Sequence, residues 1–175
     1  MIISVEKAKE LVGFPESWTD EKIKMKLLAV EQTIRAYTNN NFQNRGIRSE
    51  CDIAEGDLHG SFVGFAAGDT VQITGSVYNN GLFVVEDVRD GIMYIDGLTD
   101  EAGVRVTKIE YPADVVACAV NLMEWEVQNR GKVGIQSETL SRHSVTYFNM
   151  TAAEQVMGYP VSLLGCLKAY RKVRC

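Results

Sequence analysis

One long amphipathic stretch, residues 112–130, constrains the fold more than any other part of the sequence. Its apolar side chains recur at intervals of three and four residues, as they do on the buried face of a helix. Pro112 is favoured in a first helical turn, and Gly131 is typical of the position after a helix ends. Two neighbouring stripes result: Val116, Val120, Met123 and Val127 on one, and Val115, Ala119 and Leu122 on the other. Because so wide an apolar face needs neighbours, we expect both ends of the chain to fold back against this helix, on its first stripe.

Two further helices are predicted before this stretch. Ser4 suits the cap of a short helix over residues 5–12, which Gly13 follows. A second helix is expected after Thr19, because Asp20 and Glu21 complement the positive end of a helix dipole. Asparagines at 39–41 are expected to end this second helix. Its apolar positions lie on one face: Ile23, Leu27, Val30, Ile34 and Tyr37.

Between residues 43 and 110 the apolar period changes from about 3.6 residues to 2, which is typical of strands. Val71 and Ile73 alternate with polar neighbours, and the segments 79–81 and 90–91 contain the Asn-Gly and Asp-Gly pairs that tight hairpins favour. We expect a meander of four to six short strands that curls into a small barrel or a folded sheet.

The chain after the long helix is expected to form a loop, a hairpin and two short helices. Residues 135–140 can pair with a strand at 144–148. Thr151 and Glu154 form a capping box for a short helix that Gly158 closes, and Pro160 starts the last helix. That last helix has an apolar face made of Leu163, Leu167 and Tyr170.

The predicted fold class is α+β. It is a helical bundle formed by both chain ends and the central helix, residues 1–42 and 111–175, with a small antiparallel β module inserted at 43–110. The longest apolar runs are far shorter than the ~20 residues of a membrane span, and the first residues do not resemble a secretory signal, so we expect folding in a cytosol. Four widely scattered cysteines are expected to be free thiols: Cys51, Cys118, Cys166 and Cys175.

Charge and motifs exclude several classes of function. A net charge of −5 disfavours a surface that grips phosphates, although DNA can still pass along an acidic wall. No glycine-rich phosphate loop or nucleophile elbow occurs, and neither His59 nor His143 has the context of a catalytic base. Asp57 and His59, with Asp52 and Glu55 nearby, can be interpreted as a divalent-cation site or as a solvated acidic strand edge. We expect no catalytic residue, no cofactor and no bound metal.

The remaining candidates concern contact between proteins. The basic C-terminal helix is either a docking element or a solvated helix end, and the long segment 131–148 is either a binding hairpin or a plain connector. Trp125 is either a core residue or an interface anchor. The candidate partner-binding residues are Leu164, Leu167, Lys168, Tyr170, Arg171, Lys172 and Arg174. The candidate hairpin residues, for an interface or a lumen, are Lys132, Ser137, Glu138, Arg142, His143 and Tyr147.

Several segments carry a family resemblance: 3–11, 34–42, 137–140, 144–147, 158–160 and 167–172. Together they resemble the head-tail connector proteins of long-tailed double-stranded DNA phages and prophages. The middle segment, 68–88, is similar to small β modules in phage structural proteins.

The resemblance implies a structural virion protein without catalytic residues. Its copies would form a ring, commonly a dodecamer, beneath the portal of the filled head, and the ring would bind a stopper or tail-completion protein. Double-stranded DNA would pass through it without sequence recognition, and no membrane would be involved. Assembly would take place in the host cytoplasm, and the finished protein would lie in the virion neck. Residues 164–175 would then contact the portal, and the helical bundle with the 131–148 hairpin would line the inner surface.

Other functions stay open. The chain could be a different neck or tail-completion protein, or a small nucleic-acid-binding barrel built from residues 43–110. The barrel requires a basic, aromatic face, whereas acids outnumber the basic residues there. A small enzyme would be supported if Asp52, Glu55, Asp57 and His59 gathered around a metal ion. The basic residues of the β segment are Arg45, Arg48, Arg89, Arg105 and Lys108.

Overall fold

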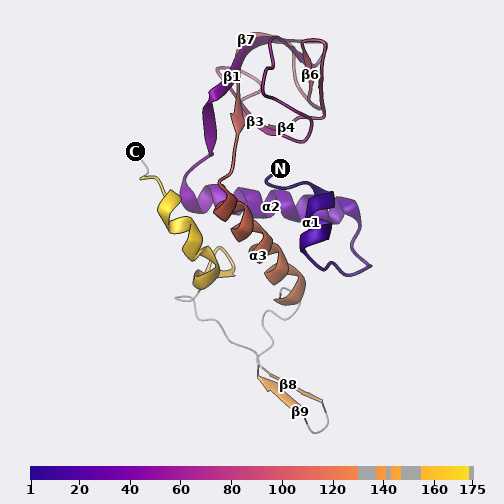
Figure 1. The fold of residues 1–175 in the computed structure, drawn as a ribbon, viewed down its shortest axis with the longest axis vertical. Helices are drawn as coiled ribbons and strands as arrows, with labels where there is room; N and C mark the ends of the chain where they lie inside the picture. Colours follow the sequence, from indigo (N-terminus) through magenta and orange to yellow (C-terminus); the bar gives the residue numbers. More distant parts are fainter. Residues whose placement is uncertain (130–136, 141–142, 147–154, 174–175) are drawn as a thin grey trace. The chain divides into compact units, whose positions relative to one another are not determined.

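The computed structural model describes residues 1–129, 137–140, 143–146 and 155–173. It divides into two compact units (Figure 1). Met1–Ser4 and Asn41–Tyr111 form the first, called here the β unit, and Val5–Asn40 with Pro112–Cys175 forms the second, called the helical unit. In the described part of the chain, no helix has both the length and the apolar character that a membrane crossing requires.

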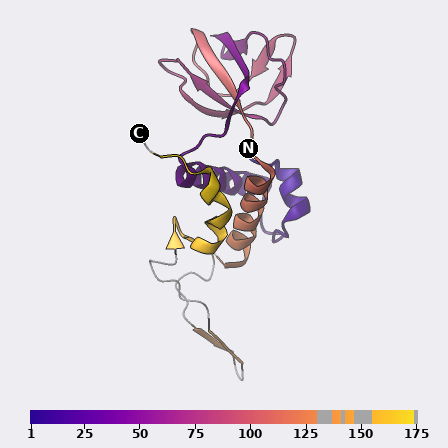
Figure 2. The ribbon, with the colours of Figure 1, turned by 60° about the vertical axis from the view of Figure 1, so that its left-hand side comes forward.

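The β unit contains one antiparallel sheet of seven strands, which lie side by side in the order β4-β3-β7-β1-β2-β6-β5. The two edge strands follow one another in the chain, and Figure 2 shows the strands curving around a common interior. Val85 and Glu86 link the two edge strands, β4 and β5. The amide of Val85 donates to the carbonyl of Asp69, just before β3, at 2.9 Å, and the amide of Glu86 donates to the carbonyl of Tyr94, on β6, at 2.9 Å. The link is therefore hydrogen-bonded to both ends of the sheet. The strands are β1 (Gln43–Ala54), β2 (Asp57–His59), β3 (Thr70–Thr74), β4 (Gly81–Val84), β5 (Asp87–Arg89), β6 (Ile92–Tyr94) and β7 (Glu101–Ile109).

The inside of this sheet is a hydrophobic core of its own, because alternate side chains of the strands point inward. The predicted architecture is therefore wrong: the structure is α+β, but the seven-stranded sheet dominates it, and the chain is not a helical bundle with a small β insertion. The prediction gave most weight to the single longest apolar helix, whereas short strands bury as much when many of them share one interior. The buried residues of this core are Cys51, Ile53, Leu58, Phe62, Phe65, Val71, Ile73, Val85, Met93, Ile95, Val104 and Val106.

Two tight turns set the register of the β unit. Asp90 and Gly91 have φ angles of 53° and 78° between β5 and β6, which confirms the predicted hairpin turn. Glu55 and Gly56 have φ angles of 55° and 82° between β1 and β2, a turn that the sequence analysis did not single out.

The first two helices of the helical unit agree with the sequence. They are α1 (Val5–Leu11) and α2 (Asp20–Thr38), and the hydroxyl of Thr19 caps α2 by accepting from the amide of Lys22 at 3.3 Å. Asn39 ends α2 with a φ of 50°. Four of the five predicted core positions are buried, and the fifth, Tyr37, is partly buried. The buried four are Ile23, Leu27, Val30 and Ile34.

The central helix, α3 (Ala113–Asn129), packs through a different face from the one expected. The second stripe is buried together with Met123 and with two residues outside both stripes, Cys118 and Glu126. Three residues of the first stripe are only partly buried: Val116, Val120 and Val127. Glu126 is one of the buried residues, because its carboxylate accepts from the Tyr159 hydroxyl at 2.8 Å and from Lys26 Nζ at 2.9 Å. The buried face of α3 therefore includes a carboxylate, and the apolar pattern alone does not reveal this face. The buried set is Val115, Cys118, Ala119, Leu122, Met123 and Glu126.

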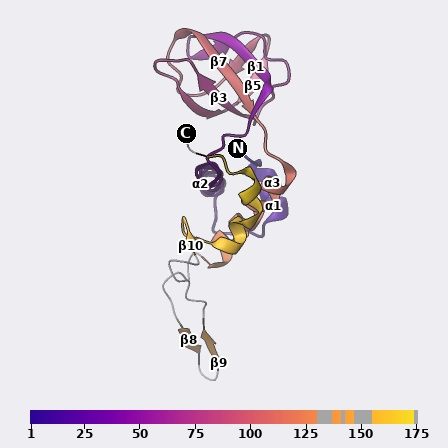
Figure 3. The same ribbon diagram turned by 90° about the vertical axis from the view of Figure 1, so that its left-hand side faces the viewer.

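The C-terminal part differs most from its prediction (Figure 3). Strands β10 (Gln155–Val156) and β11 (Tyr159–Pro160) form a hairpin, so a helix closed by Gly158 is wrong for these residues, while Thr151 and Glu154 lie outside the described ones. The predicted pairing of the preceding hairpin is present between β8 (Ser137–Leu140) and β9 (His143–Thr146).

The last helix, η3 (Val161–Tyr170), is a 3₁₀ helix rather than an α-helix. Three residues per turn place positions 161, 164, 167 and 170 on one face, whereas an α-helical spacing predicts 163, 167 and 170. Leu164 and Leu167 are accordingly fully buried, and Leu163 is only partly buried.

Candidate functional site

The acidic residues considered as a metal site do not converge. Asp52 and His59 lie opposite one another on β1 and β2, but Asp52 Oδ1 accepts from the amide of Gly103 at 2.8 Å. His59 Nε2 lies 3.3 Å from the carbonyl oxygen of Ala54. Within the described ranges, no three or more His, Cys, Asp or Glu side chains are placed to hold a metal ion together. Asp52, Asp57 and His59 lie on β1 and β2, which are each paired on both sides, so a strand edge does not describe their position.

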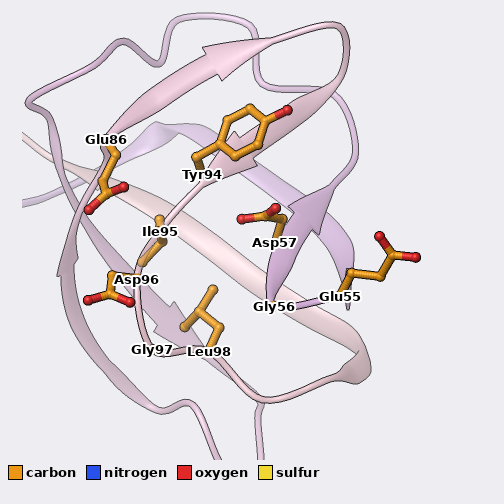
Figure 4. Close-up of a pocket in the computed structure, with 9 residues that line it drawn as sticks. All are labelled: Glu55, Gly56, Asp57, Glu86, Tyr94, Ile95, Asp96, Gly97 and Leu98. Atoms are coloured by element: carbon orange, nitrogen blue, oxygen red, sulfur yellow. The ribbon is translucent and has the colours of Figure 1, made fainter.

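An open hollow of about 280 Å³ lies beside the turn between β1 and β2 in the β unit. Figure 4 shows Glu86 and Asp96 on one side of it, with Asp57 nearer to Tyr94 and with Glu55 turned away. So many carboxylates around one hollow repel phosphate and favour basic groups. The lining residues are Glu55, Gly56, Asp57, Glu86, Tyr94, Ile95, Asp96, Gly97 and Leu98.

The predicted free thiols are confirmed for the three cysteines that the structure describes. Burial raises the pKa of Cys51 to about 11, and burial also raises the pKa of Cys118, with a smaller contribution from neighbouring Cys166. Both groups stay protonated near neutral pH and are poor nucleophiles. Cys166 is exposed, and Cys175 lies outside the described residues.

The candidate partner-binding residues of the C-terminal helix separate into two groups. Leu164 and Leu167 are fully buried in the helical unit, and their role in partner binding stays a prediction. Tyr170 donates to both carboxylate oxygens of Asp114, at 2.7 and 2.8 Å, and this hydrogen bond raises the pKa of Tyr170. Lys168 is exposed on the same helix.

The end of this segment is held against α2. The guanidinium of Arg171 lies 5.2 Å from the ring centroid of Tyr37, and the amide of Lys172 donates to the carbonyl of Thr38 at 2.8 Å. Basic side chains therefore remain at the surface, while the backbone that carries them is fixed. Arg174 lies outside the described residues.

The candidate residues of the 131–148 segment are described only in part. Ser137 and Glu138 lie on β8, and His143 lies on β9 opposite Leu140. Lys132, Arg142 and Tyr147 lie outside the described residues. The predicted roles of this hairpin stay predictions.

A loop that the sequence analysis treated only as a turn is held by a network of side-chain hydrogen bonds. Residues Ser76–Asn80, called here the display loop, connect β3 to β4, and they expose Val77 and Tyr78 by 79% and 73%. Val77 and Tyr78 are adjacent, and contiguous exposed apolar surface is what marks a candidate contact site.

Glu101, the first residue of β7, holds the backbone of the display loop. Its Oε1 accepts from the amide of Val77 at 2.6 Å, and its Oε2 accepts from the hydroxyl of Ser76 and from Asn79 Nδ2, the latter at 3.1 Å. The amide of Tyr78 also donates to Oε2, at 3.4 Å. These donors, led by Ser76, lower the pKa of Glu101, so the carboxylate is charged at neutral pH.

The amides of the display loop complete its framework. Asn79 pairs with the backbone of Thr99 in both directions, donating through Nδ2 and accepting through Oδ1, each at 2.8 Å. Asn80 Oδ1 accepts from the amide of Ser76 at 3.2 Å, and its Nδ2 donates to the carbonyl of Ser76. Asn79 and Asn80 therefore act through their side chains, which bind backbone groups, and not as the positive-φ residues of a two-residue turn.

A second exposed apolar surface lies on α2 in the helical unit. It is a shallow groove of about 410 Å³ in which Met25 and Leu28 are 61% and 37% exposed. These residues lie on the opposite side of the helix from the buried row that includes Leu27. The groove, called here the α2 groove, is lined by Glu21, Lys24, Met25, Leu28, Ala29 and Gln32.

Sequence features could have indicated both surfaces. In the display loop, Ser76 stands three and four residues before Asn79 and Asn80, the spacing of side chains that cap a compact loop. In α2, Met25 and Leu28 fall outside the predicted apolar face, and apolar residues out of phase mark a second surface.

No protein-family model matches the chain, and no curated protein matches it either.

Proposed function

We propose that this protein is a non-catalytic structural subunit that assembles into a homo-oligomeric ring, and that the ring is a head-tail connector of a long-tailed phage or prophage. The observation that carries the proposal is the presence of two exposed apolar surfaces of different shape, the display loop and the α2 groove. A ring of identical subunits needs a head-to-tail interface, and such an interface needs two different patches on every copy.

The distribution of charge supports the same assembly. Residues 41–111 contain twelve acidic and five basic side chains, whereas the rest of the chain contains eleven acidic and thirteen basic ones. Opposite charge on two surfaces favours contact between unlike patches and disfavours contact between like ones. This pattern fits head-to-tail association better than a symmetric dimer.

The connector interpretation adds partners above and below the ring. The fixed C-terminal segment presents Lys168 and Arg171 at the surface, and it remains the candidate contact for a portal protein. The net negative charge of the chain suits a wall along which a duplex slides without being held. Many weak contacts repeated around the ring would give a firm seal, because each contact after the first is effectively intramolecular.

The proposal is tested by measuring mass and shape. The purified full chain is analysed by native mass spectrometry and negative-stain electron microscopy over a wide range of concentration, alone and with a portal protein from the same phage or prophage genome. Rings that appear with rising concentration or on the portal support the proposal. A chain that stays monomeric under all these conditions contradicts it, and salt-sensitive binding of labelled DNA by such a monomer would favour the nucleic-acid-binding alternative.

A further inference from the structure

Two thiols of the helical unit share one hydrogen-bond acceptor. The Sγ atom of Cys118, on α3, lies 3.3 Å from the carbonyl oxygen of Leu163, and the Sγ atom of Cys166, on η3, lies 3.5 Å from the same oxygen. A carbonyl oxygen has two lone pairs and can accept from both thiols. The two sulfur atoms are therefore neighbours in the folded chain, although the cysteines are far apart in the sequence.

Contacts on both sides of this thiol pair hold η3 against α3. Leu164 and Leu167, which flank Cys166 along η3, are fully buried. The hydroxyl of Tyr170 donates to both carboxylate oxygens of Asp114, which lies one turn before Cys118 on α3. Because folding has already brought the two thiols together, a bond between them does not have to overcome the entropy of closing a long loop.

The two thiols differ in what can reach them. Cys166 is exposed and Cys118 is buried. A dissolved oxidant can therefore react with Cys166, whereas Cys118 needs to meet only the sulfur atom of Cys166. An accessible thiol beside a second, shielded thiol is the arrangement of many redox-sensing cysteines, in which the second thiol converts the first oxidation product into a disulfide.

We propose that Cys118 and Cys166 form a reversible disulfide when the protein meets a small disulfide such as glutathione disulfide, and that this bond fastens η3 to α3. The redox state then sets how firmly the segment that presents Lys168 and Arg171 is held. The inference goes beyond the ring proposed above and does not depend on it.

The reaction takes place in two exchange steps. The thiolate of Cys166 attacks one sulfur of glutathione disulfide, so that a mixed disulfide forms on Cys166 and one glutathione thiolate leaves. Cys118 then gives its proton to the solvent, its thiolate attacks the Sγ atom of Cys166, and the second glutathione leaves. Two protein thiols are oxidised and one glutathione disulfide is reduced to two glutathione molecules. The second step is the slow one, because Cys118 must leave the Leu163 carbonyl and ionise in a buried place.

Mass spectrometry follows both steps in the full chain. The parent for this test carries Cys175→Ser, is incubated with glutathione disulfide under native conditions, and is then alkylated in denaturant to count the remaining thiols. We expect a transient glutathione adduct, followed by a product that retains only the thiol of Cys51. Digestion without reductant should give the peptide of Cys118 joined to the peptide of Cys166, and dithiothreitol should restore all three thiols.

Two variants separate the two steps. Cys118→Ala should stop at a lasting glutathione adduct on Cys166, because the thiol that displaces glutathione is absent. Cys166→Ser should acquire neither the adduct nor the disulfide, since Cys118 is shielded. A parent that keeps its adduct as Cys118→Ala does would overturn the inference. A disulfide between the Cys166 residues of two copies, or one that includes Cys51, would overturn it as well.

Hydrogen exchange tests whether the disulfide fastens the helix. Amides of η3 should exchange about tenfold more slowly in the disulfide-bonded parent than in the reduced parent, because the bond opposes local opening of η3. Amides of β3, in the other unit, should exchange equally in both forms, and glutathione disulfide should leave η3 exchange in Cys166→Ser unchanged. Equal or faster exchange of η3 in the disulfide-bonded parent would show that the bond does not act as a clamp.

Discussion

Glu101 accepts a 2.6 Å hydrogen bond from the backbone amide of Val77, twenty-four residues earlier in the chain. This bond joins the first residue of β7 to the tip of the connection between β3 and β4. Through it, an ionised side chain on a strand of the sheet controls the position of an exposed apolar side chain.

Replacing Glu101 with glutamine should loosen the display loop without unfolding the β unit. A neutral amide has one oxygen to offer where the carboxylate has two, and its NH₂ group faces amides that also donate. We expect amide hydrogen exchange at Val77 and Tyr78 to become about tenfold faster. Glu50→Gln is the matched control, because Glu50 is an exposed acid that pairs with Arg105 at 2.6 Å and lies outside this loop. Unchanged exchange in E101Q would contradict the role given to the carboxylate.

The same loop should respond to acid. The pKa of Glu101 in the folded protein is lowered chiefly by the hydroxyl of Ser76 and the amide of Val77, so the ionised form is the one that the fold favours. The resulting stabilisation is fully present above the pKa of the unfolded chain, about 4.3, and is lost as the pH falls through the lower folded value. Exchange at Val77, corrected for its intrinsic pH dependence, should therefore rise as the pH is lowered from 6 to 3. In E101Q the corrected rate should stay flat over this range, and a parallel rise in both proteins would assign the effect to another group.

The sequence was most informative where one physical effect acts alone. Ile23, Leu27, Val30 and Ile34 recur on one helical face and are buried, and Thr19 and Asn39 bound that helix as their capping chemistry predicts. The Asp90-Gly91 turn was equally accessible, since only a few residues adopt the positive φ angles that it needs.

The rest depends on tertiary contacts that a local pattern does not contain. Glu126 is a core residue because Tyr159, thirty-three residues later, and Lys26, a hundred residues earlier, both donate to it. The buried face of η3 was predicted wrongly because this helix repeats every 3 residues and not every 3.6. The rigid display loop was missed because the residue that holds it, Glu101, is distant in sequence. The dominance of the sheet was missed for a related reason: five of its seven strands are only three to five residues long and give weak periodicity singly, yet they share one core with the longer β1 and β7.

A matched pair of leucines tests the assignment of the two faces of α2. Leu27 is fully buried and Leu28 is 37% exposed, although they are adjacent in sequence and chemically identical. Leu27→Ala should lower the free energy of unfolding by about 2–5 kcal/mol, because it leaves a cavity in the core. Leu28→Ala should lower it by less than about 1 kcal/mol. Urea denaturation of both variants, at a concentration where the parent is monomeric, measures the difference, and equal losses would contradict the described orientation of the helix.

Because Tyr159 donates to the buried carboxylate of Glu126, its hydroxyl should contribute more to the free energy of unfolding than the hydroxyl of Tyr170 does. Tyr159→Phe removes the 2.8 Å hydrogen bond to a nearly inaccessible charge, and we expect a loss of about 1–3 kcal/mol in the free energy of unfolding. Tyr170→Phe removes a hydrogen bond of similar length to Asp114, which is exposed, so its loss should be clearly smaller than that of Tyr159→Phe. Thermal and urea denaturation of the two variants give the comparison. A larger loss from Tyr170→Phe would mean that Glu126 is better solvated than its burial indicates.

Thiol reactivity should differ sharply among the described cysteines. The thiolate is the reactive form, and burial raises the pKa of Cys51 to about 11 and also raises the pKa of Cys118, whereas Cys166 lies exposed on η3. In a Cys175→Ser background, an aromatic disulfide reagent at pH 8 should label one thiol rapidly, and Cys166→Ser should abolish that phase. The two remaining thiols should react only as fast as the protein opens, and at once in denaturant. Rapid labelling of Cys118 in the native protein would show that η3 leaves the surface of α3 far more often than the buried side chains of Leu164 and Leu167 imply.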